Sequence, residues 1–477
     1  MVLLMGIAMG VSILLSAVVP AEHETGLDIR GWVLSLGIAL SVGAVMFLLG
    51  NLKWKKQAMR RREAMALVGV GWFVCSWVAA LPYLFCDPHV SWDFAFFEGV
   101  SGLTTTGASI FVELETLPKS ILMWRSVTQW LGGMGILAMF VVVLSGMIQS
   151  SKTLIGAESS LSNSDLSSLR QTMRWLWAVY FVFTLVCGLG LLAMGLTPFQ
   201  AVNHALTAAS TGGFSTETSS VSGEIFHPVM KIWLLVFMLL GAISFPFYLS
   251  ILKGKWASLR QNFEEVYWFL GIFVIASTVL LLAFYAGLQP GAEPVDLIFN
   301  VASVMTSTGY VSSDFGEWSR LGLGVLILLM IIGGCSGSTA GGLKVSRILF
   351  WCRFLGSGFV RSFRPKVVNP IKLNGRQVQE NSVEQLFMVI SLFGFFTIVG
   401  IFCIQLLEPT QSFLGSVSAV ISCLGNIGPA LADMGGVDSF AEVGPASKIV
   451  FAGLMILGRL EYVAFLVLFS RQLWRKY

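Results

Sequence analysis

The sequence predicts an all-α polytopic membrane protein, in which two leading transmembrane helices precede four pseudo-symmetric helix–pore loop–helix repeats around one central ion pathway. The composition is 55% hydrophobic and only 12% charged, with a mean hydropathy of +0.79, whereas soluble domains carry about 25% charged residues. Apolar segments long enough to cross a bilayer recur along the chain. A short glycine-containing sequence recurs four times at intervals of about 100 residues, which indicates internal repeats.

The predicted spans comprise two leading helices and four pairs. They are expected near 2–20, 31–50, 64–86, 119–148, 172–195, 229–252, 265–288, 320–349, 384–407 and 447–471. Between the members of each pair lies an apolar segment too short to cross the membrane, as half-helices that re-enter it are. These half-helices are expected near 93–104, 198–209, 294–306 and 411–422.

The chain therefore divides into a leading pair, four repeats and one linker. The leading two-helix domain is 1–52, the repeats are 64–150, 170–254, 262–352 and 383–473, and a basic cytoplasmic linker is 353–382. The first apolar stretch, which ends near Ala21, has no lysine or arginine before it, unlike a secretory signal. We therefore expect a retained first helix.

Charge predicts the orientation of the chain in the membrane. Most of the 30 lysines and arginines fall in loops on one side, and the positive-inside rule assigns that side, with both termini, to the cytoplasm. Most of the 26 acidic residues fall on the other side. An acidic outer vestibule would attract cations, although acidic residues alone have little influence on topology.

The four recurring loops have the composition of an ion filter. Backbone carbonyls can replace the water shell of K⁺ when the chain runs extended, and that conformation favours glycine because of its positive φ. Each preceding half-helix would direct the negative end of its dipole at the ion. The expected filter residues are Thr105, Thr106, Gly107, Ser210, Thr211, Gly212, Ser307, Thr308, Gly309, Cys423, Leu424, Gly425 and Asn426.

In this alignment the four filter glycines are Gly107, Gly212, Gly309 and Gly425. Nine residues before them come Glu98, Asn203, Asn300 and Ser416, which are all polar. Clusters of serine, threonine and glycine can also serve only to let helices pack closely. Four clusters at one offset, each between two spans, favour the pore over this alternative.

These loops resemble those of the Trk/Ktr/HKT superfamily of cation transporters. The resemblance rests on the span–loop–span order, on Ser101–Ser109 in the first repeat and on Leu424–Pro429 in the fourth, and it covers residues 64–471. The extra leading helices are similar to the bacterial TrkH branch rather than to KtrB. Glycine at all four filter positions implies K⁺ as the transported ion, because a serine at the first position, where this chain has Gly107, goes with sodium in the superfamily.

A glycine-rich run interrupts the second span of the third repeat. Residues Gly333–Gly342 contain five glycines in ten residues, which should break a helix in mid-membrane. Leu343 separates the run from Lys344, so it is not a Walker phosphate loop. We expect an intramembrane loop beneath the filter, similar to the gating loop of the superfamily. The expected gate residues are Gly333, Gly334, Gly337, Ser338, Gly341, Gly342, Lys344 and Arg459.

Two ionisable residues, Arg459 and Glu461, lie inside the last predicted span. Such residues are costly in the bilayer and by default indicate function. The resemblance implies that Arg459 contacts the gating loop, whereas a structural ion pair without a gating role is the alternative. Arg125, near the outer end of its span, is equally consistent with a structural anchor.

The predicted function is potassium uptake by a non-enzymatic membrane subunit. No cofactor for catalysis, no nucleic acid and no ATP-hydrolysing motif is expected, and membrane lipid surrounds the chain. The resemblance implies a homodimer in the bacterial inner membrane and a cytosolic ring of nucleotide-binding regulatory subunits (TrkA-like). The basic linker suits either docking of those subunits or anionic lipid. A mixed K⁺/Na⁺ or ammonium transporter is the main alternative, and a membrane enzyme is disfavoured because no convergent catalytic set appears.

Overall fold

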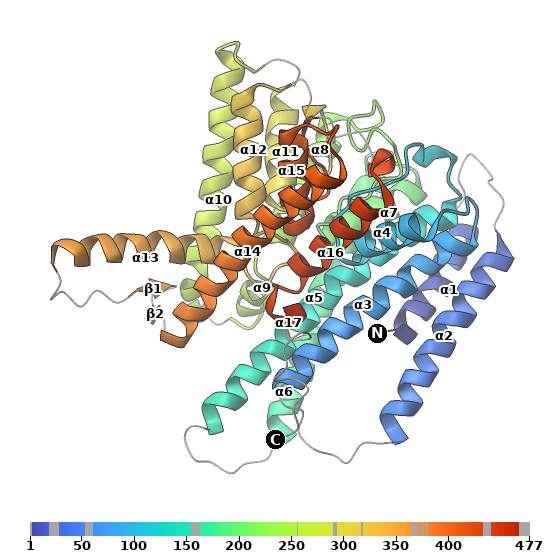
Figure 1. Ribbon diagram of the computed structural model, residues 1–477, viewed down its shortest axis with the longest axis horizontal. Helices are drawn as coiled ribbons and strands as arrows, with labels where there is room; N and C mark the ends of the chain where they lie inside the picture. Colours follow the sequence, from blue (N-terminus) through green and yellow to red (C-terminus); the bar gives the residue numbers. More distant parts are fainter. Residues whose placement is uncertain are drawn as a thin grey trace.

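Short helices between pairs of long ones are the recurring feature of this protein, as its computed structural model shows in Figure 1. The structure describes residues 2–18, 28–52, 61–153, 163–254, 256–289, 293–315, 318–364, 371–373, 376–377, 380–432 and 440–466. The basic residues expected in the loop at 53–60, like most of the 365–382 part of the linker, lie outside these ranges.

The helices follow the order predicted from hydropathy. The leading pair is α1 (Val2–Val18) and α2 (Ile29–Leu52). The first and second repeats contain α3 (Arg61–Phe85), α4 (Trp92–Leu103), α5 (Lys119–Thr153), α6 (Asn163–Ala193), α7 (Pro198–Ala209), α8 (Pro228–Ala242) and α9 (Phe245–Leu252). The third and fourth contain α10 (Trp256–Tyr285), α11 (Pro294–Met305), α12 (Arg320–Ile332), α13 (Val345–Phe363), α14 (Glu380–Leu407), α15 (Phe413–Gly425), α16 (Pro445–Arg459) and α17 (Val463–Leu466).

The half-helices α4, α7, α11 and α15 lie where the sequence predicts short apolar segments. Their N-termini are set by local signals, because α7 and α11 begin with proline, and Thr197 caps α7 by accepting a hydrogen bond from the Gln200 amide. The side chain of Ser412 caps α15 in the same way. Each half-helix packs against the first span of its own repeat, in the pairs α3–α4, α6–α7, α10–α11 and α14–α15.

The repeats are joined in a closed cycle by the second span of each. Helix α5 packs against α7, α8 against α11, α12 against α15, and α16 returns to α4. Every half-helix is therefore held between its own first span and the second span of the preceding repeat. The leading helices α1 and α2 lie outside this cycle and pack mainly against each other, α3 and α5.

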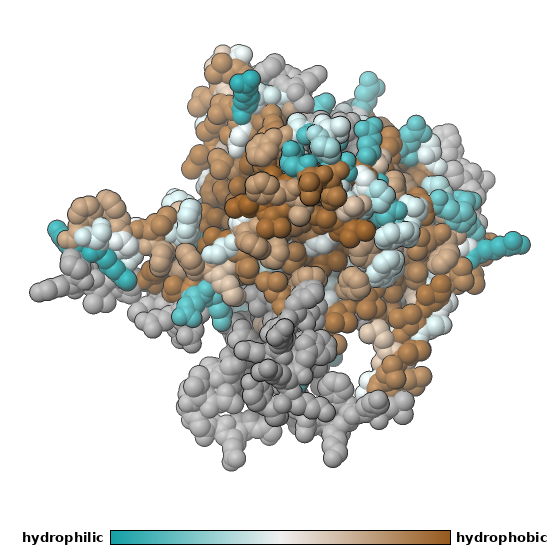
Figure 2. Space-filling model, viewed as in Figure 1, coloured by the Kyte–Doolittle hydropathy of each residue, from teal (hydrophilic) through white to brown (hydrophobic). Residues whose placement is uncertain are grey.

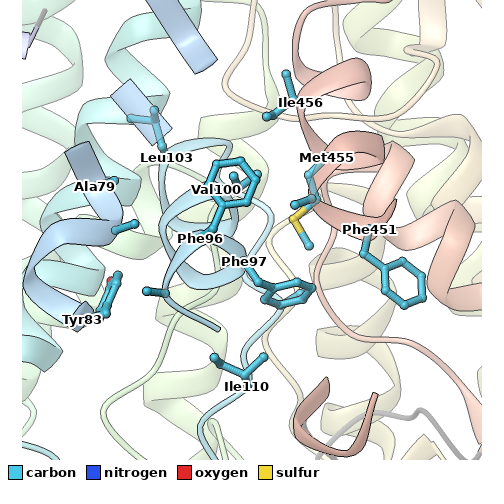
Figure 3. Packing of buried hydrophobic residues seen from close by; sticks show 14 of the residues in the cluster. Ala79, Tyr83, Phe96, Phe97, Val100, Leu103, Ile110, Phe451, Met455 and Ile456 are labelled. Atoms are coloured by element: carbon cyan, nitrogen blue, oxygen red, sulfur yellow. The ribbon is translucent and has the colours of Figure 1, made fainter. Parts of the chain in front are cut away.

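The return contact from the fourth repeat to the first is a buried apolar interface, seen in Figure 3. Phe97 on α4 lies with its ring centroid 5.5 Å from that of Phe440, which in turn lies 5.4 Å from Phe451 on α16. Met455 and Phe451 have no exposed surface. Burying such side chains contributes about 1.5–3 kcal/mol each, so the cycle is closed by the core itself.

The outer surface is apolar, as expected for a protein surrounded by lipid. Figure 2 shows hydrophobic residues over most of the described part of one face, with hydrophilic residues mainly toward its edges. Five of the described helices are long and apolar enough to cross a membrane. Many leucine, valine and phenylalanine side chains on these helices are exposed, which in water would be unfavourable over so wide an area.

Two predicted spans are broken in ways that the sequence analysis did not predict. The segment expected as one span at 229–252 forms α8 and α9, which meet at an angle of 88°. The last span, expected at 447–471, is interrupted after Arg459, where Glu461 and Tyr462 have positive φ, before α17 begins. The predicted break in the third repeat is present between α12 and α13.

Helix α13 extends sideways out of the helical bundle in Figure 1, in a different direction from α10 and α12. It carries exposed aromatic side chains, among them Trp351, Phe359 and Phe363. A two-stranded antiparallel hairpin follows within the linker, with β1 (Lys372–Leu373) paired to β2 (Arg376–Gln377). Strand structure was not expected in this linker.

Candidate functional site

The four loops leave their half-helices with the same backbone conformation. A residue one or two positions after each half-helix has a left-handed φ between 51° and 54°, and these residues are Thr105, Thr211, Ser307 and Asn426. Two positions after this residue, each of the four loops has a glycine with positive φ, and these glycines are Gly107, Gly213, Gly309 and Gly428. Such φ values favour glycine, so the pattern fixes which residues correspond.

Backbone hydrogen bonds support the same correspondence. The amide of the residue after each left-handed position donates to a carbonyl five residues earlier, from Thr106 to Ser101, Gly212 to Thr207, Thr308 to Ser303 and Ile427 to Ser422. This bond is typical of a helix that ends in a left-handed residue. It directs the chain out of the helix in the same manner in every repeat.

This correspondence corrects the predicted filter alignment in two repeats. Gly212 and Gly425 were expected beside Gly107 and Gly309, but the equivalent residues are Gly213 and Gly428. Gly425 is the last residue of α15 and lies three residues before the equivalent residue, Gly428. The physical reason is that the left-handed helix cap, rather than the first glycine in the loop, determines where the chain becomes extended.

The polar positions in the half-helices shift with the register. Ile110 donates its amide to the carboxylate of Glu98, and Ser312 donates its amide to the side chain of Asn300, so these two residues play the same role. The corresponding residue in the second repeat is His204, which contacts Thr216, rather than the expected Asn203. In the fourth repeat the residue nine before Gly428 is Ala419, which is apolar, and the adjacent Ser418 accepts the amide of Leu431, while the expected Ser416 instead bonds Gln405.

The four glycines bring the four loops together in a ring. A β-carbon on any of them would overlap a backbone carbonyl of the next loop. The overlaps are Gly107 with Gly212, Gly213 with Thr308, Gly309 with Ile427, and Gly428 with Thr106. Each loop therefore touches the next, and the fourth returns to the first. Glycine is required here for close approach as well as for its φ value.

The remaining expected filter residues lie at the base of this ring or just outside it. Thr106 and Thr308 hydrogen-bond to Thr104 and Thr306 within their own loops, at 2.7 and 2.8 Å. Asn426 bridges from the fourth loop to the Thr106 hydroxyl at 3.0 Å. Ser210 follows α7 directly, and Cys423 and Leu424 are buried within α15. The hydroxyl of Thr105 is buried and has no partner among the described residues.

A buried ion pair joins the first two loops on the outer side of the ring. The guanidinium of Arg125 lies 2.7 Å from the carboxylate of Glu98, and both side chains are at most 1% exposed. Arg125 also donates to the Ser109 hydroxyl and to the Ser215 carbonyl, and it stacks 4.0 Å above the centre of the Phe214 ring. Arg125 is thus the anchor that one reading of the sequence predicted.

Glu115 makes a further contact between these two repeats. Partial burial opposes its ionisation, but hydrogen bonds from the Thr218 hydroxyl and amide outweigh this and hold the pKa of Glu115 below its usual value.

A cavity of about 80 Å³ lies over the ring and is lined by residues of all four loops, including Gly107, Gly213, Gly309 and Gly428.

The glycine-rich run lies directly beneath the ring. Its Gly341 amide donates to the Ser307 hydroxyl at 2.6 Å, and its Gly342 amide donates to the Gly425 carbonyl at 2.9 Å. The Thr211 hydroxyl donates to that of Thr339 at 3.1 Å. Three of the four pore loops therefore hold the run in place, two of them through their left-handed residues.

The expected glycines of the run make sharp turns possible. Gly333, Gly337 and Gly342 have φ of 72°, 74° and 77°. A β-carbon on Gly334 would overlap Ala340, so the start and end of the run lie side by side. Ser338 closes one turn by donating to the Cys335 carbonyl at 2.6 Å.

The unpredicted break between α8 and α9 supplies backbone partners for the run. The Cys335 amide donates to the Ala242 carbonyl and the Phe245 amide donates to the Gly337 carbonyl, each at 2.9 Å. The Ala242 carbonyl and the Phe245 amide belong to the interrupted stretch of the second repeat. Groups freed by a broken helix need such partners in a membrane, so the two breaks satisfy each other.

Charged residues fix the run from the cytoplasmic direction that the sequence predicts. Arg459 donates to the Thr339 carbonyl of the glycine-rich run at 2.9 Å. Lys344, at the end of the run, lies 3.1 Å from the Glu461 carboxylate, and Arg347 pairs with the same carboxylate. Glu265 on α10 was not predicted as a site residue, and its carboxylate accepts the amides of Ser336 and Ser346 at 2.7 and 3.2 Å.

A smaller cavity lies below the ring and is lined by Gly341, Asn426, Arg459 and Glu461. It holds about 10 Å³, which is about the room that one water molecule needs. The arrangement is therefore a ring of carbonyl and hydroxyl oxygens with a larger cavity on one side and the glycine-rich run on the other. Such an arrangement can bind dehydrated cations and control their passage.

Comparison with known proteins connects this arrangement to a family. Residues 38–476 match the family model TrkH, described as a cation transport protein. The Trk system potassium uptake protein TrkH of Salmonella typhimurium is 31% identical, over 94% of this chain and 92% of that protein. The Escherichia coli protein of the same name is 30% identical over the same shares. The crystal structure of the potassium transporter TrkH from Vibrio parahaemolyticus superimposes with a TM-score of 0.86 at 27% identity, covering 99% of this chain and 97% of that one.

Proposed function

Because this chain belongs to the TrkH family of cation transport proteins, we propose that it is the membrane subunit of a potassium-uptake system and conducts K⁺ through the ring of four pore loops. The observation that carries the proposal is the closure of that ring, in which each loop glycine abuts a carbonyl of the next loop. Potassium needs several oxygen dipoles in place of its water shell, and such a ring supplies them.

The filter is built from backbone carbonyls and from the left-handed residues at the base of the ring. The carbonyls are those of Thr106, Gly212, Thr308 and Ile427, which the glycine contacts bring to one level. The unpartnered Thr105 hydroxyl adds a further oxygen. The half-helices point their C-terminal ends at the ring, and the negative end of each dipole favours a cation there.

The glycine-rich run Gly333–Gly342 is the gate. Its bonds to Ser307, Gly425 and Thr211 hold it against the base of the filter, and the space beside it is too small for a hydrated ion. Opening requires these bonds and the Arg459 contact to break. Moving one K⁺ inward is driven by the membrane potential, which supplies about 2.3 kcal/mol per charge per 100 mV.

Charge and exposed surface support the expected location and partners. We place the chain in the bacterial inner membrane with both termini in the cytoplasm, because most of the 30 basic residues are in loops on one side. The aromatic side chains exposed on α13, such as Phe359 and Phe363, suit a second copy of the chain, which supports a homodimer. The basic linker is the docking surface for a TrkA-like nucleotide-binding regulatory subunit.

A filter of the same shape that passes K⁺ and Na⁺ alike is the second candidate. It is favoured by the hydroxyl-rich base of the ring, because hydroxyl oxygens also suit Na⁺. The test is rubidium uptake into proteoliposomes that contain the purified chain, in competition with K⁺, Na⁺ and Li⁺. Block by K⁺ but not by Na⁺ supports a selective potassium pathway, and equal block by Na⁺ supports the mixed filter.

The same assay with a shortened glycine-rich run separates a closed gate from a wrong function. If the full chain alone takes up no rubidium, a variant lacking Ser336–Ala340 should restore uptake, because the obstruction is removed. A correctly folded deletion variant that still takes up nothing would contradict the proposed conduction pathway.

A further inference from the structure

One glutamine outside the four loops contacts the backbone of the ring directly. Gln129 lies on α5, in the second span of the first repeat, and its side chain has no exposed surface. Its side-chain nitrogen donates to the Gly212 carbonyl at 2.6 Å, and its side-chain oxygen accepts the Phe214 amide at 3.1 Å. The amide group therefore bridges the peptide bonds on either side of Gly213.

The contact makes one of the four ring carbonyls different from the other three. Within the part of the chain that the structure describes, no hydrogen-bond donor reaches the carbonyls of Thr106, Thr308 or Ile427. The Gly212 carbonyl, at the same level of the ring, has one lone-pair direction occupied by Gln129. Its position is thereby fixed, whereas the other three can adjust to the ion.

The neighbouring turn of α5 strengthens this support. Arg125 is four residues before Gln129, on the same helix face, and its guanidinium donates to the Ser215 carbonyl at 3.2 Å. The stretch from Gly212 to Ser215 is therefore held at three backbone groups by a single helix. That helix also packs against α7, which leads into the loop.

We propose that Gln129 is a positioning residue that sets the discrimination of the filter between K⁺ and Na⁺ by fixing the Gly212 carbonyl. This inference rests on the proposed filter. Sodium is smaller than potassium, so carbonyls must move inward to coordinate it as well as water does. A carbonyl held back by a short hydrogen bond does not follow the smaller ion, so Na⁺ is coordinated incompletely.

The test compares three variants with the full chain in the rubidium-uptake assay. Gln129→Met removes both hydrogen bonds with little change of size, and Gln129→Glu keeps the acceptor for Phe214 but loses the donor to Gly212. Thr128→Val is the matched control, because the Thr128 hydroxyl donates to the Arg125 carbonyl within its own helix. Each variant is first checked for monodispersity and thermal stability.

The quantity measured is the Na⁺ concentration that blocks half of the uptake, divided by the corresponding K⁺ concentration. Both Gln129 variants should lower this ratio about fivefold, which corresponds to the free energy that one hydrogen bond typically contributes. Thr128→Val should leave the ratio unchanged. A merely structural role would reduce the amount of active protein, and so total uptake, without moving this ratio. If Gln129→Met does not fold, Gln129→Leu takes its place, since it is also neutral, is close in size and removes both hydrogen bonds.

Gly107→Ser separates failure of this inference from failure of the filter itself. An unchanged ratio in folded Gln129 variants, beside a shifted ratio in Gly107→Ser, overturns the role of Gln129 and leaves the filter standing. An unchanged ratio in all of them overturns both, because Gly107 contacts the Gly212 carbonyl within the ring.

Discussion

The hydroxyl of Ser307 accepts a hydrogen bond of 2.6 Å from the amide of Gly341, which joins the base of the third pore loop to the glycine-rich run. Ser307 is one of the four left-handed residues of the ring. The Ser307 oxygen at the base of the ring is therefore occupied by the run. In the proposed gate, opening frees this oxygen, so the run and an ion would compete for it.

Replacing Ser307 with alanine should raise the basal flux of the chain. The Gly341 amide would lose its partner while buried, which destabilises the closed position by about 1–3 kcal/mol. We expect an increase of fivefold or more in rubidium uptake without any regulatory subunit. Ser277→Ala on α10 is the control, because that buried hydroxyl has no partner among the described residues. Equal uptake by Ser307→Ala and the unmodified chain would show that the bond does not hold the gate.

Replacing Glu461 with glutamine should also favour the open gate. Glu461 pairs with Lys344 at 3.1 Å and with Arg347, so its charge ties the end of the run to the break in the last span. The carboxylate is about one third exposed, and pairs of this kind contribute about 1 kcal/mol or less. We expect a two- to fivefold rise in basal uptake.

The control for Glu461 is Glu264→Gln. Glu264 pairs with Arg353 between α10 and α13, and its side chain is comparably exposed. A general loosening of the cytoplasmic side would raise uptake in both variants. A rise confined to Glu461→Gln identifies a latch on the gate, and no rise in either variant would contradict it.

The arrangement of the helices could be predicted from sequence because hydropathy and length determine which segments span a bilayer. The half-helix expected at 198–209 is α7 with the same bounds, and that expected at 294–306 is α11 (Pro294–Met305). Proline at the first helical position and a glycine-containing loop after the last one mark both ends locally. No contact between distant parts of the chain is needed to place them.

The filter register could not be predicted in two repeats because both contain more than one suitable glycine. Gly212 and Gly213 are adjacent, and Gly425 precedes Gly428 by three residues. The choice depends on the left-handed helix cap, which is not tied to one residue type. Threonine, serine and asparagine all occupy it, as Thr211, Ser307 and Asn426 demonstrate.

The breaks at 243–244 and after Arg459 depend on long-range partners. Ser244 and Pro246 allow a helix to end and restart, but the α8–α9 break is stabilised by the Cys335 and Gly337 backbone groups of another repeat.

Glu265 and Gln129 have a usable signal, since each is a polar residue within an apolar span. Their partners are backbone amides and carbonyls, which no residue pattern reveals.

The Glu98–Arg125 pair should be important for stability, because it is fully buried. Glu98→Gln leaves the Arg125 charge without its counter-ion, and breaking a buried pair in this way costs about 3–5 kcal/mol. We expect a clear drop in the unfolding temperature of the detergent-solubilised protein. The double variant with Arg125→Met should recover part of the loss, because no unpaired charge remains. Arg125→Met alone is measured as well. If the loss of stability in the double variant equalled the sum of the losses in the two single variants, the two residues would not be coupled.

Two glycines of the fourth loop distinguish the observed register from the one expected from sequence. Gly428 has a φ of 108°, and a β-carbon there would lie 2.6 Å from the Thr106 carbonyl of the first loop. Gly425 has no positive φ, and its added β-carbon would meet first the flexible end of the Ile427 side chain, at 3.0 Å. We therefore expect Gly428→Ala to lower the K⁺ preference over Na⁺ by tenfold or more, from a strain of about 1–3 kcal/mol at the ring. Gly425→Ala should keep most of the preference, and it serves as the matched control in the same rubidium competition assay. The reverse result, with Gly425→Ala the more damaging variant, would mean that Gly425 is the true equivalent of Gly107 and that the left-handed cap does not set the filter register.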